Sequence, residues 1–410
     1  MKTERSYPRY TVTPKGEAWL KGGHPWVYED EITQAPDQTP ENGSLVDVVS
    51  GKGRYLGTGF LSLHSKIRVR LLSRNANDRF DPDFWERRLR YAWEYRKAVL
   101  GQEDLQACRL VFGEADQLPG LTVDRFGEIL VAQTLSYGMD RLKSLIFPLL
   151  VRILEEDGQT ISGLYERNDE ALRDKEGLEQ YKGWFALPGR PTPAQTWTQI
   201  RENGVLYRVD FENGQKTGFF LDQKFNRRAV AHLARGRRVL DCFTHTGSFA
   251  LNAALGGAEH VTAVDVSETA LETARANARL NGLEDRMDFL AADVFDLLPR
   301  LEAEGCPYDF IILDPPAFTK ARKTARNALR GYKEINYRAM KLLPRGGYLA
   351  TASCSHFATE EMFVKMLHEA ARDAGRQLRQ IEARQQAADH PILWNVEETA
   401  YLKFYLFQVI

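Results

Sequence analysis

Acidic residues stand at the ends of several predicted strands, where their carboxylates could bind the hydroxyl groups of a ligand. Each one follows an apolar stretch that is typical of a buried strand. A single acid in this place often only caps the next helix. Four in succession instead favour a crevice that grips a nucleoside-bearing cofactor beyond the strand ends. The four residues are Asp241, Asp265, Asp293 and Asp314.

The turn after the first of these strands distinguishes two classes of cofactor. Dinucleotide binding needs the pattern G-x-G-x-x-G, which lets the backbone approach a pyrophosphate. In "FTHTGSFA" the turn has one glycine, Gly247, and His245 stands where another glycine is common. Asp265 follows at about the twenty-residue spacing of an acid that binds ribose hydroxyls. The sequence therefore favours S-adenosylmethionine over NAD, and His245 is interpreted as a turn residue.

These acids need a scaffold of alternating strands and helices, and the chain has that pattern from about residue 195 onward. Strands are predicted at "RRVLDC", "HVTAVDVS", "MDFLAAD", "YDFIILD" and "GGYLATASCS", with helices between them. The alternation indicates an α/β fold with a doubly wound parallel sheet. The last stretch, "ETAYLKFYLFQVI", has no helix after it, so we expect a strand that joins antiparallel at the edge.

The earlier part of the chain has different patterns. Residues 1–73 alternate short β-like runs with glycine turns, which predicts a small β-barrel. Residues 74–190 predict a central α+β domain, with a hairpin at "FGE" and a helix that starts at Pro82 after the cap Asp81. The proline-rich "ALPGRPTPAQT" is interpreted as a linker to a third domain, residues 191–410.

Composition limits the class of protein. A chain of 410 residues exceeds one typical core, and its 43% apolar and 27% charged residues are ordinary for a globular protein. We expect no membrane span and no signal peptide, because no apolar run is long enough for either. The cysteines have no paired spacing, so we expect no disulfide framework, no metal site and a cytoplasmic location. They are Cys108, Cys242, Cys306 and Cys354.

A basic stretch follows the fourth strand. Nine Lys and Arg residues lie between Thr319 and Arg345 against the single acid Glu334, although the net charge of the chain is only -1. Such a run is often the solvated face of a helix. Its position directly after the strand-end loop makes phosphate contacts an equally good interpretation. The first candidates for these contacts are Arg322, Lys323 and Arg326.

The ordered set of motifs resembles the ribosomal large-subunit methyltransferase I family, the bacterial 23S rRNA 5-methylcytosine methyltransferases, over nearly the whole chain. "KGGHPWVYEDEI" is similar to the start of that family's PUA domain, and "GEADQLPGLTVDRFG" to its central domain. "GQKTGFFLDQKFNRR" is similar to the segment that precedes the methyltransferase sheet. "DCFTHTGSFA", "VTAVDVS", "DPPAF" and "SCS" match the sheet motifs in order.

The resemblance implies a large-subunit ribosomal RNA substrate and a set of cofactor residues. Asp265 would bind the ribose hydroxyls of S-adenosylmethionine, and Asp293 would lie near the adenine. The methionine part would lie against Asp241 and the turn of Thr246 and Gly247. The segment before the sheet adds Lys216, Thr217, Phe220, Gln223 and Arg227, of which Gln223 and Arg227 are the expected cofactor contacts.

The loop "DPPAF" points to a planar base as the substrate. Such loops also occur in enzymes that methylate exocyclic amines, where the acid accepts from the amine and the aromatic ring stacks on a flipped base. Pro315 and Pro316 would expose backbone carbonyls, and Phe318 would be either the stacking ring or a core aromatic. Asp314 could donate a proton to the cytosine N3 atom. The loop alone does not name the atom that is methylated.

Cys354, at the end of the next strand, favours carbon 5. That carbon is a poor nucleophile until a thiolate adds at carbon 6. Such a nucleophile needs a lowered thiol pKa, which the nearby basic stretch could favour. A cysteine at a strand end is usually core filler, and Cys242 is the main competitor as nucleophile. The base that later removes the C5 proton is not named by the sequence, and His356 is only a weak candidate.

Other functions remain open at this point. Exocyclic-amine methylation of RNA would make Cys354 dispensable, and a non-catalytic RNA-binding protein would lack affinity for the cofactor. An NAD-dependent oxidoreductase is disfavoured by the missing glycines. The modified nucleotide and the form of the RNA substrate are not given. The barrel could pair with a neighbour, so a homodimer is one candidate state.

Overall fold

The computed structural model describes residues 6–305, 308–319 and 325–410, without the side chains of residues 325 and 326. The chain forms two compact units. The first consists of residues 1–200, 209–221 and 388–399, and the second of residues 201–208, 222–387 and 400–410. The domain boundaries expected after residues 73 and 190 stay predictions. Among the described residues, no helix is long and apolar enough to cross a bilayer.

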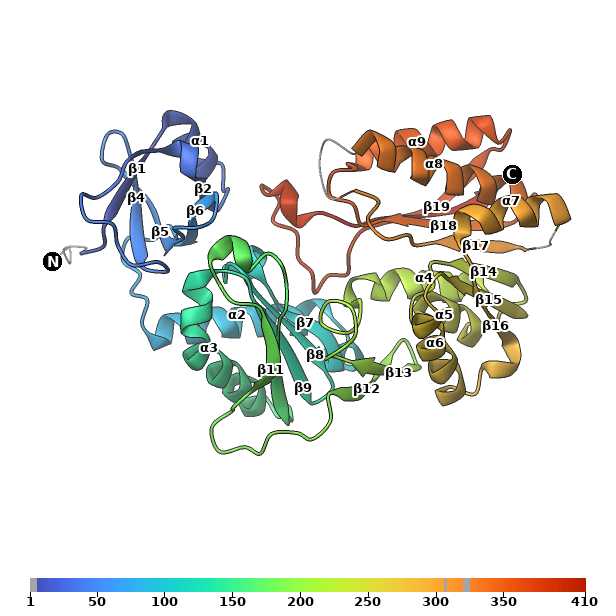
Figure 1. Ribbon diagram of the computed structural model, residues 1–410, viewed down its shortest axis with the longest axis horizontal. Helices are drawn as coiled ribbons and strands as arrows, with labels where there is room; N and C mark the ends of the chain where they lie inside the picture. Colours follow the sequence, from blue (N-terminus) through green and yellow to red (C-terminus); the bar gives the residue numbers. More distant parts are fainter. Residues whose placement is uncertain (1–5, 306–307, 320–324) are drawn as a thin grey trace. The chain divides into compact units, whose positions relative to one another are not determined.

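The first unit begins with a six-stranded sheet in the order β2-β6-β5-β4-β1-β3 (Figure 1). Its interior is apolar, with Val27, Val46, Val48 and Val69 fully buried. This is the predicted barrel. Its elements are β1 (Arg9–Val12), α1 (Pro14–Lys21), β2 (Trp26–Tyr28), β3 (Ile32–Gln34), β4 (Leu45–Ser50), β5 (Tyr55–Leu61) and β6 (Ile67–Ser73).

A five-stranded sheet in the order β11-β10-β9-β8-β7 follows, and it carries two long helices. The helix predicted at Pro82 is confirmed, because Asp81 caps it by accepting a hydrogen bond from the Phe84 amide. The predicted hairpin is the β8–β9 pair. The elements are α2 (Pro82–Val99), β7 (Ala107–Phe112), β8 (Leu121–Phe126), β9 (Ile129–Thr134), α3 (Tyr137–Glu156), β10 (Gly163–Asn168) and β11 (Tyr181–Phe185).

An irregular stretch, residues 186–196, leads from β11 to the two-stranded sheet of β12 (Trp197–Glu202) and β13 (Val205–Asp210). The prolines of the predicted linker lie in this stretch, and they explain why no regular element forms there.

The second unit is built on a seven-stranded sheet in the order β16-β15-β14-β17-β18-β20-β19. The first five strands run parallel, as predicted. Helices α4, α5 and α6 lie on one face and α7, α8 and α9 on the other (Figure 1). The strands are β14 (Arg238–Cys242), β15 (His260–Asp265), β16 (Met287–Ala291), β17 (Phe310–Leu313), β18 (Tyr348–Ser353), β19 (Leu378–Arg384) and β20 (Lys403–Val409).

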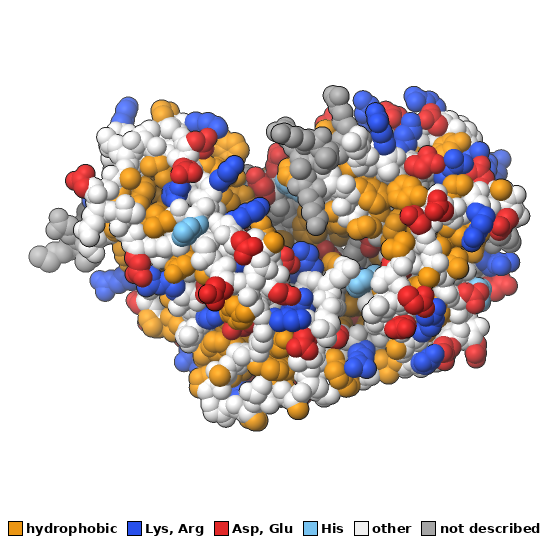
Figure 2. Space-filling view, viewed as in Figure 1, with side chains coloured by type: hydrophobic (Ala, Val, Ile, Leu, Met, Phe, Trp, Pro, Cys, Tyr) orange, Lys and Arg blue, Asp and Glu red, His pale blue; other side chains and the backbone are white. Residues whose placement is uncertain are grey.

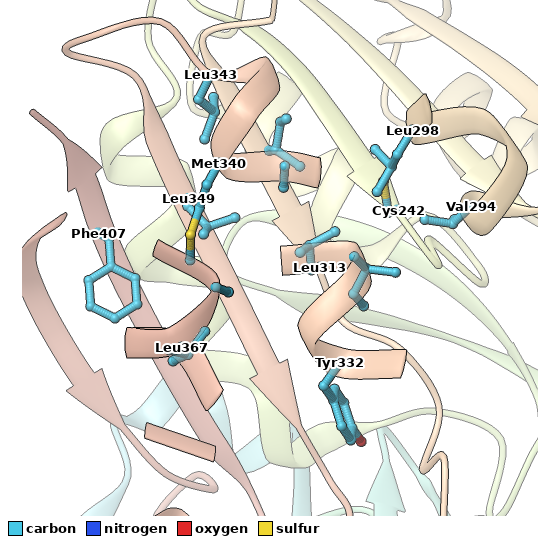
Figure 3. Close-up of a cluster of buried hydrophobic side chains, with 14 of the residues drawn as sticks. Cys242, Val294, Leu298, Leu313, Tyr332, Met340, Leu343, Leu349, Leu367 and Phe407 are labelled. Atoms are coloured by element: carbon cyan, nitrogen blue, oxygen red, sulfur yellow. The ribbon is translucent and has the colours of Figure 1, made fainter. Parts of the chain in front are cut away.

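The helices of this unit supply its apolar layers. The helices of one face close a core in which Tyr332 and Leu367 of two helices lie with the strand residues Leu349 and Phe407 (Figure 3). Cys242 lies in this core beside Val294 and Leu298. The helices are α4 (Lys224–Leu233), α5 (Ser248–Leu255), α6 (Glu268–Leu280), α7 (Val294–Glu304), α8 (Ala325–Leu342), α9 (Glu360–Asp373) and the short η5 (Leu221–Gln223).

The last strand corrects one expectation. β20 is antiparallel to β18, as predicted, but it is not at the edge, because β19 pairs with its other side. The sequence of β19, "LRQIEAR", is polar, and its residues are exposed or only partly buried. An edge strand needs little apolar surface, so hydrophobic periodicity did not reveal it.

Candidate active site at the strand ends

The four strand-end acids come from neighbouring strands. Asp241 and Asp265 lie near the ends of β14 and β15, Asp293 follows β16, and Asp314 directly follows β17. These strands are adjacent and parallel in the order β16-β15-β14-β17, so their carboxyl ends lie along one edge. The sequence prediction that these acids share an edge is confirmed.

The carboxylate of Asp265 is fixed by two backbone amides. His245 N donates to Oδ2 and Ser267 N donates to Oδ1, both at 2.9 Å. His245 has a φ of +51°, in the left-handed region, which turns its amide toward the carboxylate. The backbone of His245 therefore does the positioning, and burial lowers the pKa of its ring. This geometry agrees with its interpretation as a turn residue.

The turn of Thr246 and Gly247 packs tightly on helix α6. Gly247 has a φ of +81°, and a Cβ atom there would come within 3.0 Å of the Ala274 Cβ. The Thr246 carbonyl accepts a hydrogen bond from Asn277 Nδ2 at 3.2 Å. One glycine is therefore enough to bring the β14–α5 loop against α6.

Asp241 is fully buried behind this turn. Its Oδ2 atom accepts from Thr244 Oγ1 at 2.6 Å and from the Ala250 amide at 2.9 Å. Its Oδ1 atom has no hydrogen-bond partner among the described residues. Burial is the main cause that raises the pKa of Asp241 to about 7. The Oδ2 atom of Asp241 thus fixes the loop between β14 and α5, while its Oδ1 atom has no donor among the described residues.

Asp293 has a visible structural role. It is exposed, and it caps α7 by accepting a hydrogen bond from the Phe295 amide at 2.8 Å. A role near an adenine ring stays a prediction for this residue.

The two residues expected to contact the cofactor from the preceding segment differ in their surroundings. Arg227 is buried, and its Nε and Nη2 atoms pair with the two carboxylate oxygens of Glu202 at 2.7 and 2.9 Å. This geometry favours a structural ion pair. Gln223 is also buried, and its Nε2 donates to Asp314 Oδ1 at 2.9 Å, while its Oε1 accepts from Asn226 Nδ2. Gln223 therefore orients the carboxyl of Asp314.

Asp314 is partly buried at the start of the Pro-Pro loop, with Pro315 buried and Pro316 exposed. Burial raises the pKa of Asp314 to about 7, and the negative charge of Asp222 adds to this rise. The hydrogen bond from Gln223 and the charge of Arg227 act in the opposite direction. A carboxyl group with this pKa can hold or release a proton near neutral pH.

Phe318 packs among other aromatic rings. Its ring centroid lies 4.6 Å from that of Tyr332, 5.8 Å from that of Phe295 and 6.4 Å from that of Phe243. It is partly buried against the core of this unit. Of the two interpretations of Phe318, these contacts support the core aromatic, and stacking on a base stays a prediction.

Cys354 directly follows β18, and Asp314 directly follows the neighbouring strand β17. The thiol is partly buried. Burial raises its pKa to about 12, aided by the charges of Asp314 and Asp222 and opposed by that of Lys403. The expectation of a lowered thiol pKa is therefore wrong, because desolvation and the neighbouring acids outweigh the nearby cation. Its competitor Cys242 is fully buried in the core.

Three residues of this region were not singled out from the sequence: Lys403, Tyr401 and Asp222. Lys403 Nζ donates to the carbonyls of Ser355 and Tyr401 at 2.7 and 3.0 Å, and burial lowers the pKa of this amine to about 8. The Tyr401 hydroxyl donates to Asp222 Oδ2 at 2.7 Å. The available signal was Lys403 itself, a charged residue in the apolar run "KFYLF".

Comparison with known proteins identifies the family. Residues 183–408 match S-adenosylmethionine-dependent methyltransferases, and residues 11–74 match PUA-like domains. A ribosomal RNA large subunit methyltransferase I from Klebsiella pneumoniae (strain 342) is 38% identical over 409 residues, 100% of each chain. A protein of the same name from Pseudoalteromonas translucida (strain TAC 125) is 42% identical over 387 residues, 94% of this chain and 95% of the other. The chain belongs to the ribosomal RNA large subunit methyltransferase I family.

Solved structures support the same fold for this family member. A protein from Streptococcus mutans described as a SAM-dependent methyltransferase is 22% identical, with a TM-score of 0.81 over 98% of this chain and 100% of that chain. A methyltransferase solved in complex with SAH has a TM-score of 0.82 at the same identity and coverage. At this identity the similarity establishes the fold, and it confirms the fold class expected from the sequence.

S-adenosylmethionine is the cofactor of this methyltransferase family, and the described residues fit it. The buried Oδ1 atom of Asp241, which lacks a partner, is an acceptor that the cationic methionine part could satisfy. The carboxylate of Asp265, held by two backbone amides, is an acceptor suited to hydroxyl groups.

The basic stretch is described only in part. Arg322 and Lys323 lie outside the described residues, as does the side chain of Arg326. Farther along α8, Lys333 pairs with Asp373, and Arg338 and Lys341 both pair with Glu302. Basic and acidic side chains are also interspersed over the face seen in Figure 2. This part of α8 is therefore a solvated helix face, and phosphate contacts stay a prediction for the first part of the stretch.

We expect Asp314 to make stability depend on pH. Because its folded-state pKa of about 7 lies above the ordinary value of 3.8, the folded protein keeps this proton where the unfolded chain has lost it. Relative to Asp314→Asn, the wild type should therefore lose stability as the pH rises from 5 to 7. The loss is at most about 1.4 kcal/mol per pH unit, and it levels off above pH 8. Urea unfolding gives the free energy of unfolding of both proteins at each pH. A difference between the two free energies that stays constant from pH 5 to 7 would contradict this prediction.

Proposed function

We propose that this protein methylates carbon 5 of a cytidine in large-subunit ribosomal RNA, with Cys354 as the nucleophile that adds to carbon 6. The names of its relatives support the RNA substrate. The observation that carries the choice of atom is the placement of Cys354 and Asp314 at the ends of the adjacent parallel strands β18 and β17. A thiol and a carboxyl with a pKa near 7 are the two groups that this chemistry needs.

In this proposal the strand-end loops hold the cofactor. Asp265 accepts hydrogen bonds from the ribose hydroxyls, and Asp293 lies by the adenine. Asp241 and the turn of Thr246 and Gly247 face the methionine part. Bound S-adenosylmethionine supplies an activated methyl group on a sulfonium. The buried pair of Arg227 with Glu202 ties α4, which directly follows Gln223, to β12.

The loop after β17 recognises the cytosine. Pro315 and Pro316 keep the backbone carbonyls exposed to the base, and Phe318 stacks on it or supports the loop from the core. The protonated carboxyl of Asp314 donates to N3, and Gln223 holds that carboxyl by its other oxygen. A pKa of about 7 lets Asp314 give up this proton as the ring accepts electrons.

Cys354 makes the covalent bond. Its Sγ atom bonds to C6 as the S–H bond breaks and its proton passes to water, and the electron pair of the C5=C6 bond moves into the ring. N3 takes its proton from Asp314, so C5 becomes an enamine carbon that can accept a methyl group. The Lys403 ammonium stabilises the sulfur as its proton leaves. Because burial raises the thiol pKa, the proton should leave only once a base is bound.

The alternative is methylation of an exocyclic amine without a covalent intermediate. The raised thiol pKa is the observation that favours it, since a neutral thiol is a poor nucleophile. In this alternative Asp314 accepts a hydrogen bond from the amine, and Cys354 is only a neighbour of the base.

Removing the carboxylate of Asp265 should weaken cofactor binding. A hydrogen bond to a charged acceptor contributes about 1.5–3 kcal/mol, so Asp265→Ala should lower affinity for S-adenosylmethionine roughly 10- to 100-fold. Isothermal titration calorimetry measures it. The control is Asp288→Ala, which removes an exposed acid of β16 that pairs with His260. Unchanged affinity in Asp265→Ala would remove this residue from the cofactor site.

Covalent trapping tests the proposed nucleophile. RNA fragments that carry 5-fluorocytidine should form a stable adduct with the wild type, because fluorine cannot leave C5 as a proton does. Cys354→Ala should form none on a denaturing gel, while Cys108→Ala, a buried cysteine of the first unit, should behave as the wild type. An adduct that survives in Cys354→Ala would assign the nucleophile to Cys242 or elsewhere. Intact methyl transfer without any adduct would establish the alternative.

The first part of the basic stretch should contact RNA phosphates. Replacement of Arg322, Lys323 and Arg326 by Ala should weaken RNA binding and flatten its dependence on salt. The slope of the logarithm of the binding constant against the logarithm of the salt concentration should become shallower. The change should be about 0.7 for each phosphate of a single-stranded RNA that is no longer neutralised. Filter binding at several salt concentrations measures this slope. The control is Lys333→Ala, whose amine pairs with Asp373. An unchanged slope in the triple variant would make this stretch a solvated helix face.

A further inference from the structure

The proposed C5 methylation, on which this inference rests, requires a base that none of the residues assigned so far provides. After C5 has received its methyl group, that carbon carries both the methyl group and its original hydrogen. The enzyme stays bonded to the RNA through Cys354 until this hydrogen leaves as a proton. The base must therefore have a free acceptor atom near both Cys354 and Asp314, and it must be held in place.

Asp222 has such an atom. Its Oδ1 atom is buried and has no hydrogen-bond partner among the described residues. Its Oδ2 atom accepts from the Tyr401 hydroxyl at 2.7 Å, and its backbone carbonyl accepts from the Ala387 amide at 2.8 Å. The first contact orients the carboxylate, and the second fixes the backbone of the same residue. A buried acceptor without a donor costs about 1–3 kcal/mol, so an unpaired oxygen in this place suggests a use.

Asp222 also stands among the reacting groups. The next residue along the chain, Gln223, donates to Asp314 at 2.9 Å. The Lys403 amine donates hydrogen bonds to two backbone carbonyls. One belongs to Tyr401, which holds Asp222, and the other to Ser355, the neighbour of Cys354. The charge of Asp222 raises the pKa of both Asp314 and Cys354.

Other described groups suit the role less well. His356 is exposed, and its ring packs on the adjacent Phe357. The Lys403 amine already donates to two carbonyls, and an ammonium has donors only. Asp314 is assigned to N3 and is held there by Gln223.

We propose that Asp222 is the base that removes the C5 proton, with Tyr401 as its positioning residue. The C5–H bond breaks and its proton goes to Asp222 Oδ1. The electron pair of that bond restores C5=C6, and the C6–S bond breaks with its electrons on Cys354 Sγ. The N3 proton returns to Asp314. The proton on Asp222 then passes to the Cys354 sulfur and restores the thiol, so the net release is the one proton that left the thiol at the start.

The test uses the variant Asp222→Asn and unmodified RNA. Its amide keeps the shape of the side chain but cannot take a proton, so attack by Cys354 and methyl transfer proceed and release stops. With S-adenosylmethionine labelled in its methyl group, we expect a labelled protein–RNA adduct on a denaturing gel, at least about tenfold more abundant than for the wild type. The double variant Asp222→Asn, Cys354→Ala should form none.

Tyr401→Phe is the matched variant, because it keeps the carboxylate of Asp222 and removes only the hydrogen bond to Oδ2. It should accumulate an intermediate amount of labelled adduct and turn over more slowly than the wild type. This variant keeps the test valid if the amide of Asp222→Asn disturbs folding.

The outcomes separate the two proposals. Release at the wild-type rate without adduct in both variants would overturn the role of Asp222, provided that the wild type is trapped by 5-fluorocytidine. A loss of S-adenosylmethionine affinity in Asp222→Asn without adduct would also overturn it and assign the residue to the cofactor site. A wild type that 5-fluorocytidine does not trap would overturn the C5 function itself.

Discussion

The desolvation of carboxyl groups at one sheet edge is the constraint on which the site depends. Asp241 and Asp314 each have a pKa near 7 because water is kept from them. A buried carboxyl with a raised pKa lowers the stability of the fold at neutral pH unless hydrogen-bond donors contact it. The hydrogen bonds from Thr244, Ala250 and Gln223 provide that support. The same burial gives Asp314 the pKa at which a carboxyl can serve as an acid and then as a base.

This constraint also explains the chemistry expected of Cys354. Burial beside two acids disfavours a free thiolate, so the resting thiol is protected from adventitious oxidation and from other electrophiles. The nucleophile would then form only when a planar base displaces water and draws the proton of Asp314. The reactivity of the Cys354 thiol would thereby be coupled to substrate binding without a conformational change of the protein.

Several elements could be predicted from the sequence because local signals decide them. The cap and proline fix the start of α2, and the alternation of apolar runs fixes the parallel strands and the acids at their ends. Family motifs placed Asp265 and the Gly247 turn at one edge, where the two amides and the positive φ values hold them.

The remainder depends on contacts between residues distant in sequence. Asp222, Tyr401 and Lys403 carry no shared motif, and they meet only because β20 brings Tyr401 and Lys403 to Asp222 and Ser355. The polar strand β19 has no periodicity that a sequence could show. The pKa of Cys354 was predicted in the wrong direction, because the sequence does not show that burial and the charges of Asp314 and Asp222 outweigh the charge of Lys403.

The reversed direction of β20 has a consequence for biosynthesis. Because this strand runs against its neighbour β18, its first residues arrive at the edge where the parallel strands end. Tyr401 and Lys403 thus reach Asp222 and Ser355 only after the ribosome has made some fifty further residues beyond Cys354. β19 likewise has to wait for β20 as its pairing partner. A nascent chain therefore has the loops after β14 and β15 well before Tyr401 and Lys403 complete the surroundings of Cys354.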